Sequence, residues 1–376
     1  MRWIFLLALA VSTFSQERQL TASPRTHALD NNDNFSPDGR FLCYDTRETE
    51  IWKVDIRTGA ETLLFGKGPK VVAASYHPTR DEVIFIHGPL AEPYFKSNRR
   101  GAVVSANGEV RFLDVRDVTS PVTPPGAHRG GTHRHEYSLN GRRVGFTYDD
   151  QLLPQYGRTI GMVQDGKFAV LVPVVPEAEA KPGDIVMAAN DSWVGGDGRM
   201  RAFIGRVKEA DGTFHNSLFV ADIPSDVKLG TAFAGDTKRF PAPPRGVRIR
   251  RLTTGEAGGI VRGTRDGKFI AYLAAAPDGS RQVFVIPSNG GAPRQLTQIE
   301  GGAQAGIRWH PSGSFLAVSS GRGIAVTKVA TGKTVFLTAR GGDALVWSND
   351  GKTLAFNRKV GEHMQIFLVD FTGGEF

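Results

Sequence analysis

One order of hydrophobic and polar positions recurs along the chain. An aromatic or apolar residue is followed by a small polar residue, a short turn that ends in Gly, and a run of β-forming residues. The clearest copy begins at Phe35 with the sequence FSPDGRFLCY, and β-rich runs at 51–55 and 61–64 follow it. Tight turns between such runs predict consecutive antiparallel strands. Each copy therefore predicts a small sheet.

Copies of this pattern recur about every 40 residues, which is typical of a propeller or a solenoid. They begin at Phe35, Tyr76, Tyr137, Val194, Thr264, Trp309 and Trp347, and those at Tyr76 and Val194 are the most degenerate. The 45 Gly and 21 Pro among 376 residues agree with a turn-rich β protein. The seven copies predict an all-β fold, a seven-bladed β-propeller in one domain over residues 16–376.

The first and last segments predict how the ring closes. The fifth copy ends with an outer strand at Arg294–Thr297 (RQLT), whereas the seventh copy stops after Gln365–Asp370 without one. The same four letters occur at Arg18–Thr21. We therefore expect this N-terminal strand to complete the last blade, because a closed ring protects its strand edges.

Residues 1–15 have the features of an export signal. Arg2 precedes an apolar run at Trp3–Val11, and small residues at Thr13 and Ser15 follow it. The apolar run is too short for a membrane span. We expect a periplasmic or secreted mature protein without such a span. Its single cysteine, Cys43, lies in an apolar run, which indicates a buried free thiol and no disulfide.

The charge of the chain points to an anionic partner. The net charge is +8 (46 Lys and Arg against 38 Asp and Glu), and the isoelectric point is about 9.6. Acidic polysaccharides, lipid surfaces and nucleic acids all fit this balance. Export and the lack of basic runs with interleaved aromatic residues argue against nucleic acid. We expect a monomer that binds an acidic oligosaccharide or another component of the cell envelope.

The stretch His128–Glu136 (HRGGTHRHE) contains the residues best suited to chemistry. It holds three of the nine histidines and a carboxylate. Side chains two apart in an extended segment point the same way, so His133 and His135 are predicted to present two imidazoles to one point. His128, His27 and Glu136 are further candidate ligands for Zn or Mn. The alternative is a polar loop whose histidines bond to the backbone.

Loops that precede the copies of the pattern are expected to line one mouth of the central tunnel, where ring-shaped β scaffolds bind ligands. A mouth that is polar only because it is solvated is the alternative. His77 and His310 take the small polar position of the pattern and are predicted to be structural. The predicted substrate-binding residues are Asp33, Asn190, Asp191, Gln304 and Arg134, with Asn31 and Asn32 beside them, and the predicted catalytic residues are His128, Arg262 and Arg308.

The Ser-Pro-Asp-Gly strand starts and Gln-Leu-Thr strand ends resemble TolB-type (WD40-like) β-propeller repeats, from about residue 18 to residue 376. The Gly-Gly-Thr-His-Arg-His-Glu stretch resembles an uncharacterised bacterial family of exported TolB-like propellers. These are similar to oligogalacturonate lyases, seven-bladed propellers with a histidine-rich Mn site. The resemblance implies metal ligands at His133 and His135. This chain has Gly130 about where the lyases have a ligating Gln, so its ligand set differs from theirs.

Two functions follow as hypotheses. In the first, a metal at His133 and His135 binds a uronate carboxylate, and loss of the proton on the adjacent carbon leads to β-elimination. Arg262 and Arg308 would pair with other carboxylates. In the second, the same mouth belongs to a non-catalytic TolB-like module that captures a protein or glycan. Bound metal with activity favours the first, and partner capture without metal favours the second.

Overall fold

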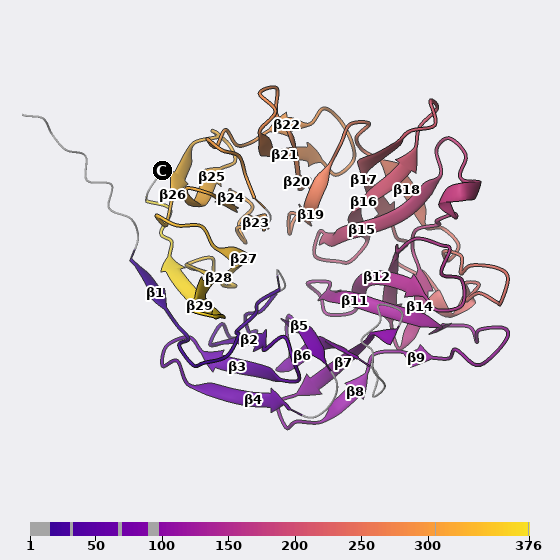
Figure 1. Cartoon of the computed structure of the whole chain (residues 1–376), viewed down its shortest axis with the longest axis horizontal. Coiled ribbons are helices and arrows are strands. Elements are labelled where there is room, and N and C mark those ends of the chain that lie inside the picture. The colour runs from indigo at the N-terminus through magenta and orange to yellow at the C-terminus, as the bar shows by residue number, and fades with distance from the viewer. Residues whose placement is uncertain (1–15, 31–32, 67–69, 89–97, 305, 375) are drawn as a thin grey trace, which may run out of the picture.

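The seven predicted sheets are present and form a closed ring (Figure 1). The computed structural model describes residues 16–30, 33–66, 70–88, 98–304, 306–374 and 376. The predicted export signal at 1–15, and Asn31 and Asn32, lie outside these ranges. Within them, no helix is long and apolar enough to cross a membrane.

Each blade is an antiparallel sheet whose strands follow one another from the centre outwards. Blade 1 holds β2 (Phe41–Asp45), β3 (Ile51–Asp55) and β4 (Glu61–Phe65), and blade 2 holds β5 (Val71–Tyr76), β6 (Glu82–His87), β7 (Arg100–Ser105) and β8 (Val110–Phe112). Blade 3 holds β11 (Gly130–Tyr137), β12 (Val144–Asp150), β13 (Thr159–Gln164) and β14 (Lys167–Val170), and blade 4 holds β15 (Ile185–Val194), β16 (Met200–Lys208), β17 (Phe214–Asp222) and β18 (Arg248–Arg251).

The second half of the ring repeats this order. Blade 5 holds β19 (Gly258–Gly263), β20 (Phe269–Ala275), β21 (Arg281–Pro287) and β22 (Arg294–Gln295), and blade 6 holds β23 (Arg308–Trp309), β24 (Phe315–Ser320), β25 (Gly323–Lys328) and β26 (Thr334–Phe336). Blade 7 holds β27 (Asp343–Trp347), β28 (Thr353–Val360), β29 (His363–Asp370) and β1 (Glu17–Gln19). A separate parallel pair joins β9 (Val115–Arg116) to β10 (Ala127–His128), and two short 3₁₀ turns lie at Glu177–Glu179 and Leu229–Thr231.

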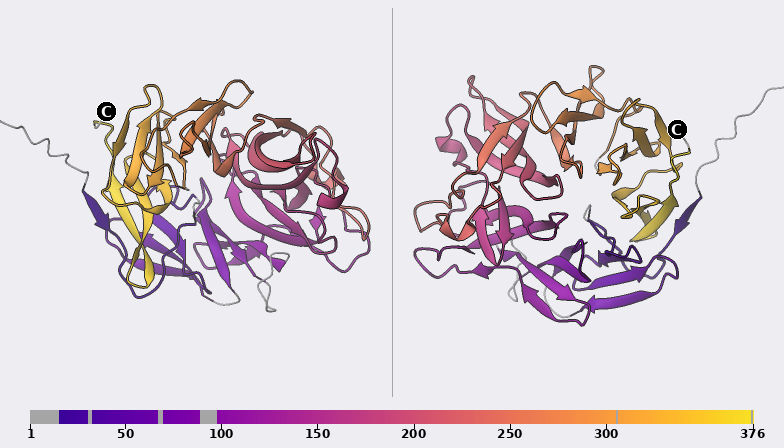
Figure 2. Two further views of the ribbon diagram at one scale, coloured as in Figure 1. Left: turned by 45° about the horizontal axis from the view of Figure 1, so that its top comes forward. Right: turned by 180° about the vertical axis from the view of Figure 1, so that it is seen from behind.

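The predicted closure by the N-terminal strand is confirmed. Strand β1 pairs antiparallel with β29, so that Glu17 lies opposite Val369 and Gln19 opposite Phe367. The hydroxyl of Thr21 donates to Gln365 Oε1 at 2.8 Å and accepts from the backbone N–H of Ile366 at 2.9 Å. The views in Figure 2 show β1 at the outer edge of the last blade. The ring is therefore held by residues from both ends of the chain.

The core consists of apolar layers between neighbouring blades. One layer joins Ala317 and Ile324 of blade 6 to Leu345 and Phe356 of blade 7. Each strand alternates its side chains between two faces, and both faces of a blade are covered by a neighbour. Cys43 is buried in such a layer as a free thiol, as predicted.

The recurring pattern works as a hydrogen-bonded turn. In blade 1 the hydroxyl of Ser36 donates to Asp38 at 2.6 Å and accepts from the N–H of Phe41 at 2.9 Å, while Gly39 takes a φ of 71°. Such a positive φ favours Gly. His77 and His310 replace this Ser, and their Nε2 atoms lie 3.3 and 3.1 Å from the carbonyl oxygens of Gly141 and Gly351 in the next blades. These contacts agree with the predicted structural role.

A left-handed residue lies in or just before the innermost strand of each of blades 2 to 7, where the register of several blades also shifts. Such a bulge breaks the simple alternation of side chains. The loop expected before the copy of the pattern at Tyr137 is instead a strand, because the His-rich stretch forms β11 with a bulge between His133 and Glu136. These left-handed residues are Ala73, Arg134, Asn190, Gly259, Gly306 and Ala344, and in blade 1 Asp30 takes a positive φ in the segment before β2.

Candidate functional site

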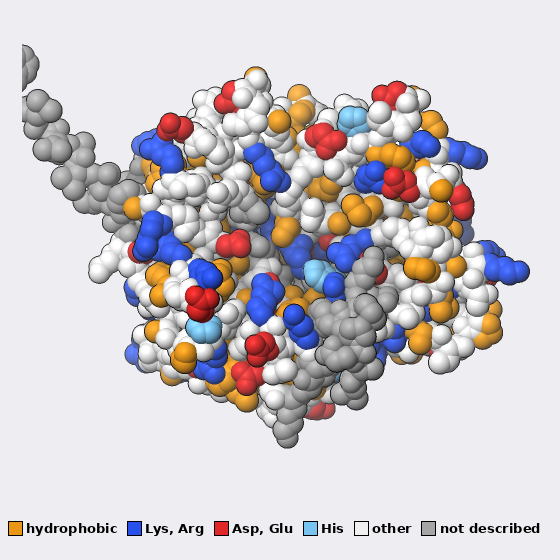
Figure 3. All heavy atoms as spheres, in the orientation of Figure 1, with side chains coloured by type: hydrophobic (Ala, Val, Ile, Leu, Met, Phe, Trp, Pro, Cys, Tyr) orange, Lys and Arg blue, Asp and Glu red, His pale blue; other side chains and the backbone are white. Residues whose placement is uncertain are grey.

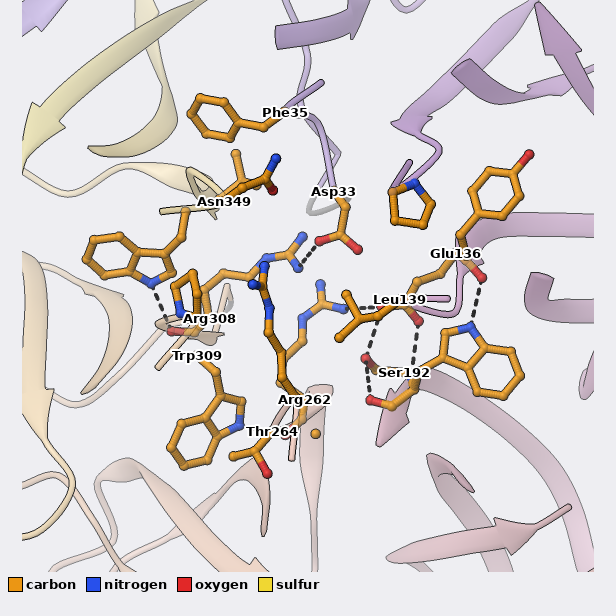
Figure 4. Close-up of a pocket in the computed structure, with 18 of the residues that line it drawn as sticks. Asp33, Phe35, Glu136, Leu139, Ser192, Arg262, Thr264, Arg308, Trp309 and Asn349 are labelled. Atoms are coloured by element: carbon orange, nitrogen blue, oxygen red, sulfur yellow. Dashed lines mark hydrogen bonds and ion pairs between the residues drawn. The ribbon is translucent and has the colours of Figure 1, made fainter. Parts of the chain in front are cut away.

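A cavity of about 420 Å³ lies where the innermost strands end and the recurring turns begin. Its wall combines charged and aromatic side chains. Figure 4 shows Arg262 and Arg308 pointing towards its middle, with Asp33 and Glu136 facing them. The charged residues that line it are Asp33, Glu136, Arg262, Arg265 and Arg308, and the aromatic residues are Phe35, Tyr76, Tyr137, Trp193, Trp309 and Trp347.

The indole groups of three tryptophans donate hydrogen bonds to the backbone of the strands that carry the charged residues. Trp193 Nε1 donates to the carbonyl of Glu136 at 2.9 Å, and Trp309 Nε1 donates to that of Arg262 at 2.8 Å. Trp347 Nε1 donates to the carbonyl of Arg308 at 3.3 Å. Each of these bonds joins one blade to the blade before it. The rings therefore wall the cavity and fix the backbone of the charged residues.

Glu136 is buried and receives four hydrogen bonds. Its Oε1 accepts from Ser192 Oγ at 3.0 Å and from Arg262 Nη1 at 3.4 Å. Its Oε2 accepts from Arg201 Nη1 at 3.0 Å and from the N–H of Trp193 at 3.2 Å. Burial alone would raise the pKa of Glu136, but the nearby arginine charges outweigh it and lower the pKa to about 2. Glu136 is thus a fixed negative charge rather than a proton donor or acceptor at neutral pH.

Arg201 is a functional candidate that sequence reasoning missed. It is fully buried, its Nε donates to Asp191 Oδ2 at 2.5 Å, and its guanidinium lies 4.6 Å from the ring centre of Trp193. Space for it exists because residue 145 in β12 is Gly, since a Cβ there would overlap the Arg201 guanidinium. A Gly inside a predicted strand signals a close approach of this kind.

Arg134 adds a fourth arginine charge to the same place. It is buried, and its Nη1 donates to the carbonyl of Asp191 at 2.8 Å. Its Nε and Nη2 have no hydrogen-bond partner within the described part of the chain. Burial lowers the pKa of Arg134, whereas the charges of Glu136 and Asp191 raise it. The cluster contains four arginines, Arg134, Arg201, Arg262 and Arg308, against three carboxylates, Asp33, Asp191 and Glu136.

Arg262 and Arg308 reach the cavity from neighbouring blades. Arg262 Nε donates to the carbonyl of Ile307 at 3.3 Å, and Arg308 Nε donates to that of Leu345 at 2.8 Å. Arg308 Nη1 also donates to Asp33 Oδ1 at 3.1 Å. Burial and the charges of Arg308 and Arg134 lower the pKa of Arg262. The predicted convergence of these arginines is therefore present.

The predicted metal ligands do not converge. Among the residues that the structure describes, no group of three or more His, Cys, Asp or Glu side chains is arranged to hold a metal ion. His27 contacts Glu61 at 2.8 Å and Ser23 at 2.9 Å, and Glu136 is held by arginines. The bulge at Arg134 explains the error in the spacing argument, because it breaks the alternation between His133 and His135.

The histidines of β10 and β11 have different nearest partners. His135 is buried against Phe146, with its Nε2 2.9 Å from Thr132 Oγ1, and burial lowers its pKa to about 4. Burial, with Arg158 and Arg99 nearby, lowers the pKa of His133 to about 3. His128 Nε2 lies 3.0 Å from Asp114. Nδ1 of His128 and of His135 lacks a hydrogen bond, yet these rings and Asp114 do not form a metal-binding group.

Other predicted residues lie outside the cavity wall. Asn190 and Gln304 are exposed and are not part of the cavity lining. Asp191 and Arg134 belong to the arginine cluster but not to that lining, and His128 is fully buried beside Asp114. The predicted residues that form part of the cavity wall are Asp33, Glu136, Arg262 and Arg308. The sequence places the mouth at the loops before the recurring turns, whereas the cavity lies where the innermost strands end and these turns begin.

The family follows from comparison with known proteins. The uncharacterised protein YidR of Escherichia coli strain K12 is 31% identical to this chain over 395 aligned positions, which cover 90% of this chain and 94% of YidR. The chain belongs to the YidR family. Residues 70–176 of this family member also match a family model described as a protein of unknown function, DUF3748.

This member of the YidR family shares its fold with lyases of known structure. An oligogalacturonate lyase in complex with manganese gives a TM-score of 0.62 at 12% identity, covering 96% of this chain and 95% of the lyase. Oligogalacturonate lyase from Vibrio parahaemolyticus gives 0.65 at 11% identity with the same coverage. The predicted relation to an uncharacterised propeller family with the lyase fold is confirmed. At this identity the likeness extends to the fold alone.

Proposed function

We propose that the cavity binds an acidic oligosaccharide and that the protein acts as a binding module in the periplasm or outside the cell. The carboxylates of the ligand would pair with Arg262 and Arg308, which approach from neighbouring blades. The sugar rings would lie against the aromatic wall formed with Trp309 and Trp347.

The excess of arginines over carboxylates is the observation that carries this proposal. A buried positive charge without a counterion is costly, so the cluster favours an added anion. Arg134 supplies this charge, because two of its nitrogen atoms lack a partner within the described ranges. On the face shown in Figure 3, Lys and Arg side chains also gather around the hollow at the centre of the ring. A carboxylate is therefore a better complement to the cavity than a neutral sugar.

Binding of trigalacturonate, measured by calorimetry, tests the proposal. We expect a Kd between about 1 µM and 1 mM for trigalacturonate, and no heat with neutral galactotriose. Arg262→Gln is expected to weaken binding roughly tenfold or more, because it removes a charged partner. Arg322→Gln is the matched control, since Arg322 is exposed, pairs with Glu300 and lies outside the cavity wall. Binding of neutral galactotriose with no heat from trigalacturonate would contradict the proposal.

Cleavage of the ligand by β-elimination stays a prediction. Of the three predicted catalytic residues, Arg262 and Arg308 line the cavity, whereas His128 is fully buried beside Asp114. Arginine stays protonated and cannot remove a proton as a base. The cavity therefore supports binding more directly than it supports elimination, and the ultraviolet absorbance of a 4,5-unsaturated product would test the reaction.

A resident Mn or Zn also stays a prediction. The described residues do not fit such an ion, because the predicted ligands His27, His128, His135 and Glu136 contact different partners. Elemental analysis of the purified protein and of the His133→Ala/His135→Ala double variant tests it. Stoichiometric metal that is lost in the variant would restore the predicted centre.

A further inference from the structure

Asp33 is the most loosely held carboxylate of the cluster. Its Oδ1 accepts from Arg308 Nη1 at 3.1 Å, but 52% of its side chain is exposed, against 9% for Arg308. The side chains of Glu136 and Asp191 are 8% and 1% exposed. An ion pair with one exposed partner contributes little to stability because water competes for it. Asp33 can therefore leave Arg308 at low cost.

The backbone of Asp33 is fixed while its side chain is open to solvent. Its carbonyl accepts from the N–H of Tyr76 at 2.7 Å and from the hydroxyl of Ser75 at 3.1 Å, both in blade 2. Figure 4 shows its carboxylate reaching into the middle of the cavity towards Arg308. Rotation of the side chain alone would expose that face of the guanidinium without moving the chain. The contact between Asp33 and Arg308 thus resembles that of a ligand carboxylate with an arginine, except that this carboxylate is attached to the protein.

We propose that Asp33 occupies the place of a ligand carboxylate on Arg308 and is displaced when an acidic saccharide binds. This inference rests on the proposed function of the cavity. A tethered competitor has a high effective concentration, so it excludes small single anions that make no other contact. A saccharide with several carboxylates also contacts Arg262 and the aromatic wall, and can therefore displace it. Asp33 is then a specificity-determining residue that selects oligouronides over free monoanions.

Isosteric neutralisation of Asp33 tests the proposal. Asp33→Asn is expected to bind trigalacturonate about two- to fivefold more tightly than the parent. This is the change in affinity that corresponds to the loss of one exposed ion pair. The gain for monomeric galacturonate should be at least as large, since it has fewer compensating contacts. Asp33→Glu keeps the charge and should bind both ligands close to parent affinity. Neutral galactotriose should show no heat with any variant.

Asp81→Asn is the matched control for a general charge effect. It removes the same charge from the turn after Pro78, a residue of the cavity wall, and Asp81 pairs with Lys53 rather than with the arginine cluster. Its affinity for trigalacturonate should stay at the parent value. An equal gain in Asp81→Asn and Asp33→Asn would overturn the proposal, because long-range charge would then explain both.

Two further outcomes separate this inference from the proposed function. If the parent binds trigalacturonate but Asp33→Asn binds it equally or more weakly, the displacement proposal alone is wrong. If neither protein binds a uronide while thermal melting shows both to be folded, the proposed function and this inference are both wrong. Melting also checks Asp33→Glu, so the charge-conserving comparison holds for folded protein.

Discussion

Two copies of the recurring turn have a histidine at the position that Ser36 occupies in blade 1. His77 and His310 take the place of Ser36, and their Nδ1 atoms accept backbone N–H groups of their own turns at 3.1 and 3.2 Å. Their Nε2 atoms face carbonyl oxygens of the next blade, which a Ser hydroxyl does not reach. Each ring therefore joins two blades as well as closing its own turn.

These contacts require neutral imidazoles, which makes them sensitive to acid. Burial lowers the pKa of both His77 and His310 below the usual value of about 6.5. As the pH falls below 6.5, the unfolded chain takes up these protons first, so the free energy of unfolding decreases. The double variant His77→Gln/His310→Gln should lose less of its stability between pH 7 and pH 5, measured by urea unfolding. An unchanged slope in the double variant would contradict this role of the two histidines.

Gly145 is required by the buried arginine that it faces. A methyl group there would overlap Arg201, whose guanidinium is held by Glu136 and Asp191 and is not free to move. Gly145→Ala should therefore destabilise the protein by about 1–3 kcal/mol in chemical unfolding, as overpacked cores do. Gly255→Ala is the control, since nothing lies within 4 Å of the added group and no positive φ is involved. Equal stabilities of the two variants would refute the assignment.

The strand that closes the ring uses the same hydrogen bonds as an internal strand. Thr21 bonds to Gln365 and Ile366 in blade 7, and Thr297 makes the corresponding bonds to Gln282 at 2.8 Å and Val283 at 2.9 Å in blade 5. The shared letters RQLT thus encode one local structure at two distant places. Only the first of them joins the ends of the chain.

Deletion of residues 16–22 should therefore cost more than the loss of these bonds alone. It removes β1 and opens an edge of β29, so we expect a loss beyond the roughly 1–3 kcal/mol of a typical point substitution. Thr297→Val breaks the corresponding bonds inside a closed blade and should stay within that range. Urea unfolding of both proteins gives the comparison, and a deletion that unfolds like the parent would contradict the role of β1.

The fold could be predicted from the sequence because it repeats, whereas the geometry of the His-rich stretch could not, because it depends on one irregular residue. Seven copies and the RQLT match identified the blades and their closure without any knowledge of contacts. The spacing of His133 and His135 indicates a shared direction only in a regular strand. Arg134 takes a φ of 59°, which no local pattern reveals in a non-glycine residue. Arg201 was missed because one of its two carboxylate partners, Glu136, comes from the neighbouring blade and no local pattern marks the contact.

The charge of the whole molecule is expected to strengthen the proposed binding of an acidic saccharide. The net charge is +8, and the arginine cluster lies at the centre of the ring. Raising the salt from 50 to 300 mM should weaken trigalacturonate binding, because screening shortens the range of exposed charges to below about 10 Å. Calorimetry at several salt concentrations measures this slope. A slope of zero would mean that the arginines do not pair with the ligand.

The tryptophans that join neighbouring blades also allow binding at the cavity to be followed by fluorescence in solution. The sequence has five tryptophans, and Trp193, Trp309 and Trp347 all line the cavity, while Trp52 lies under Arg25 at 3.8 Å. The fifth, Trp3, belongs to the predicted export signal. Three of the four tryptophans outside the predicted export signal therefore lie at the cavity wall, so we expect an incoming saccharide to change the intrinsic fluorescence. The protein carries its own optical probe at the place where its ligand is expected to bind.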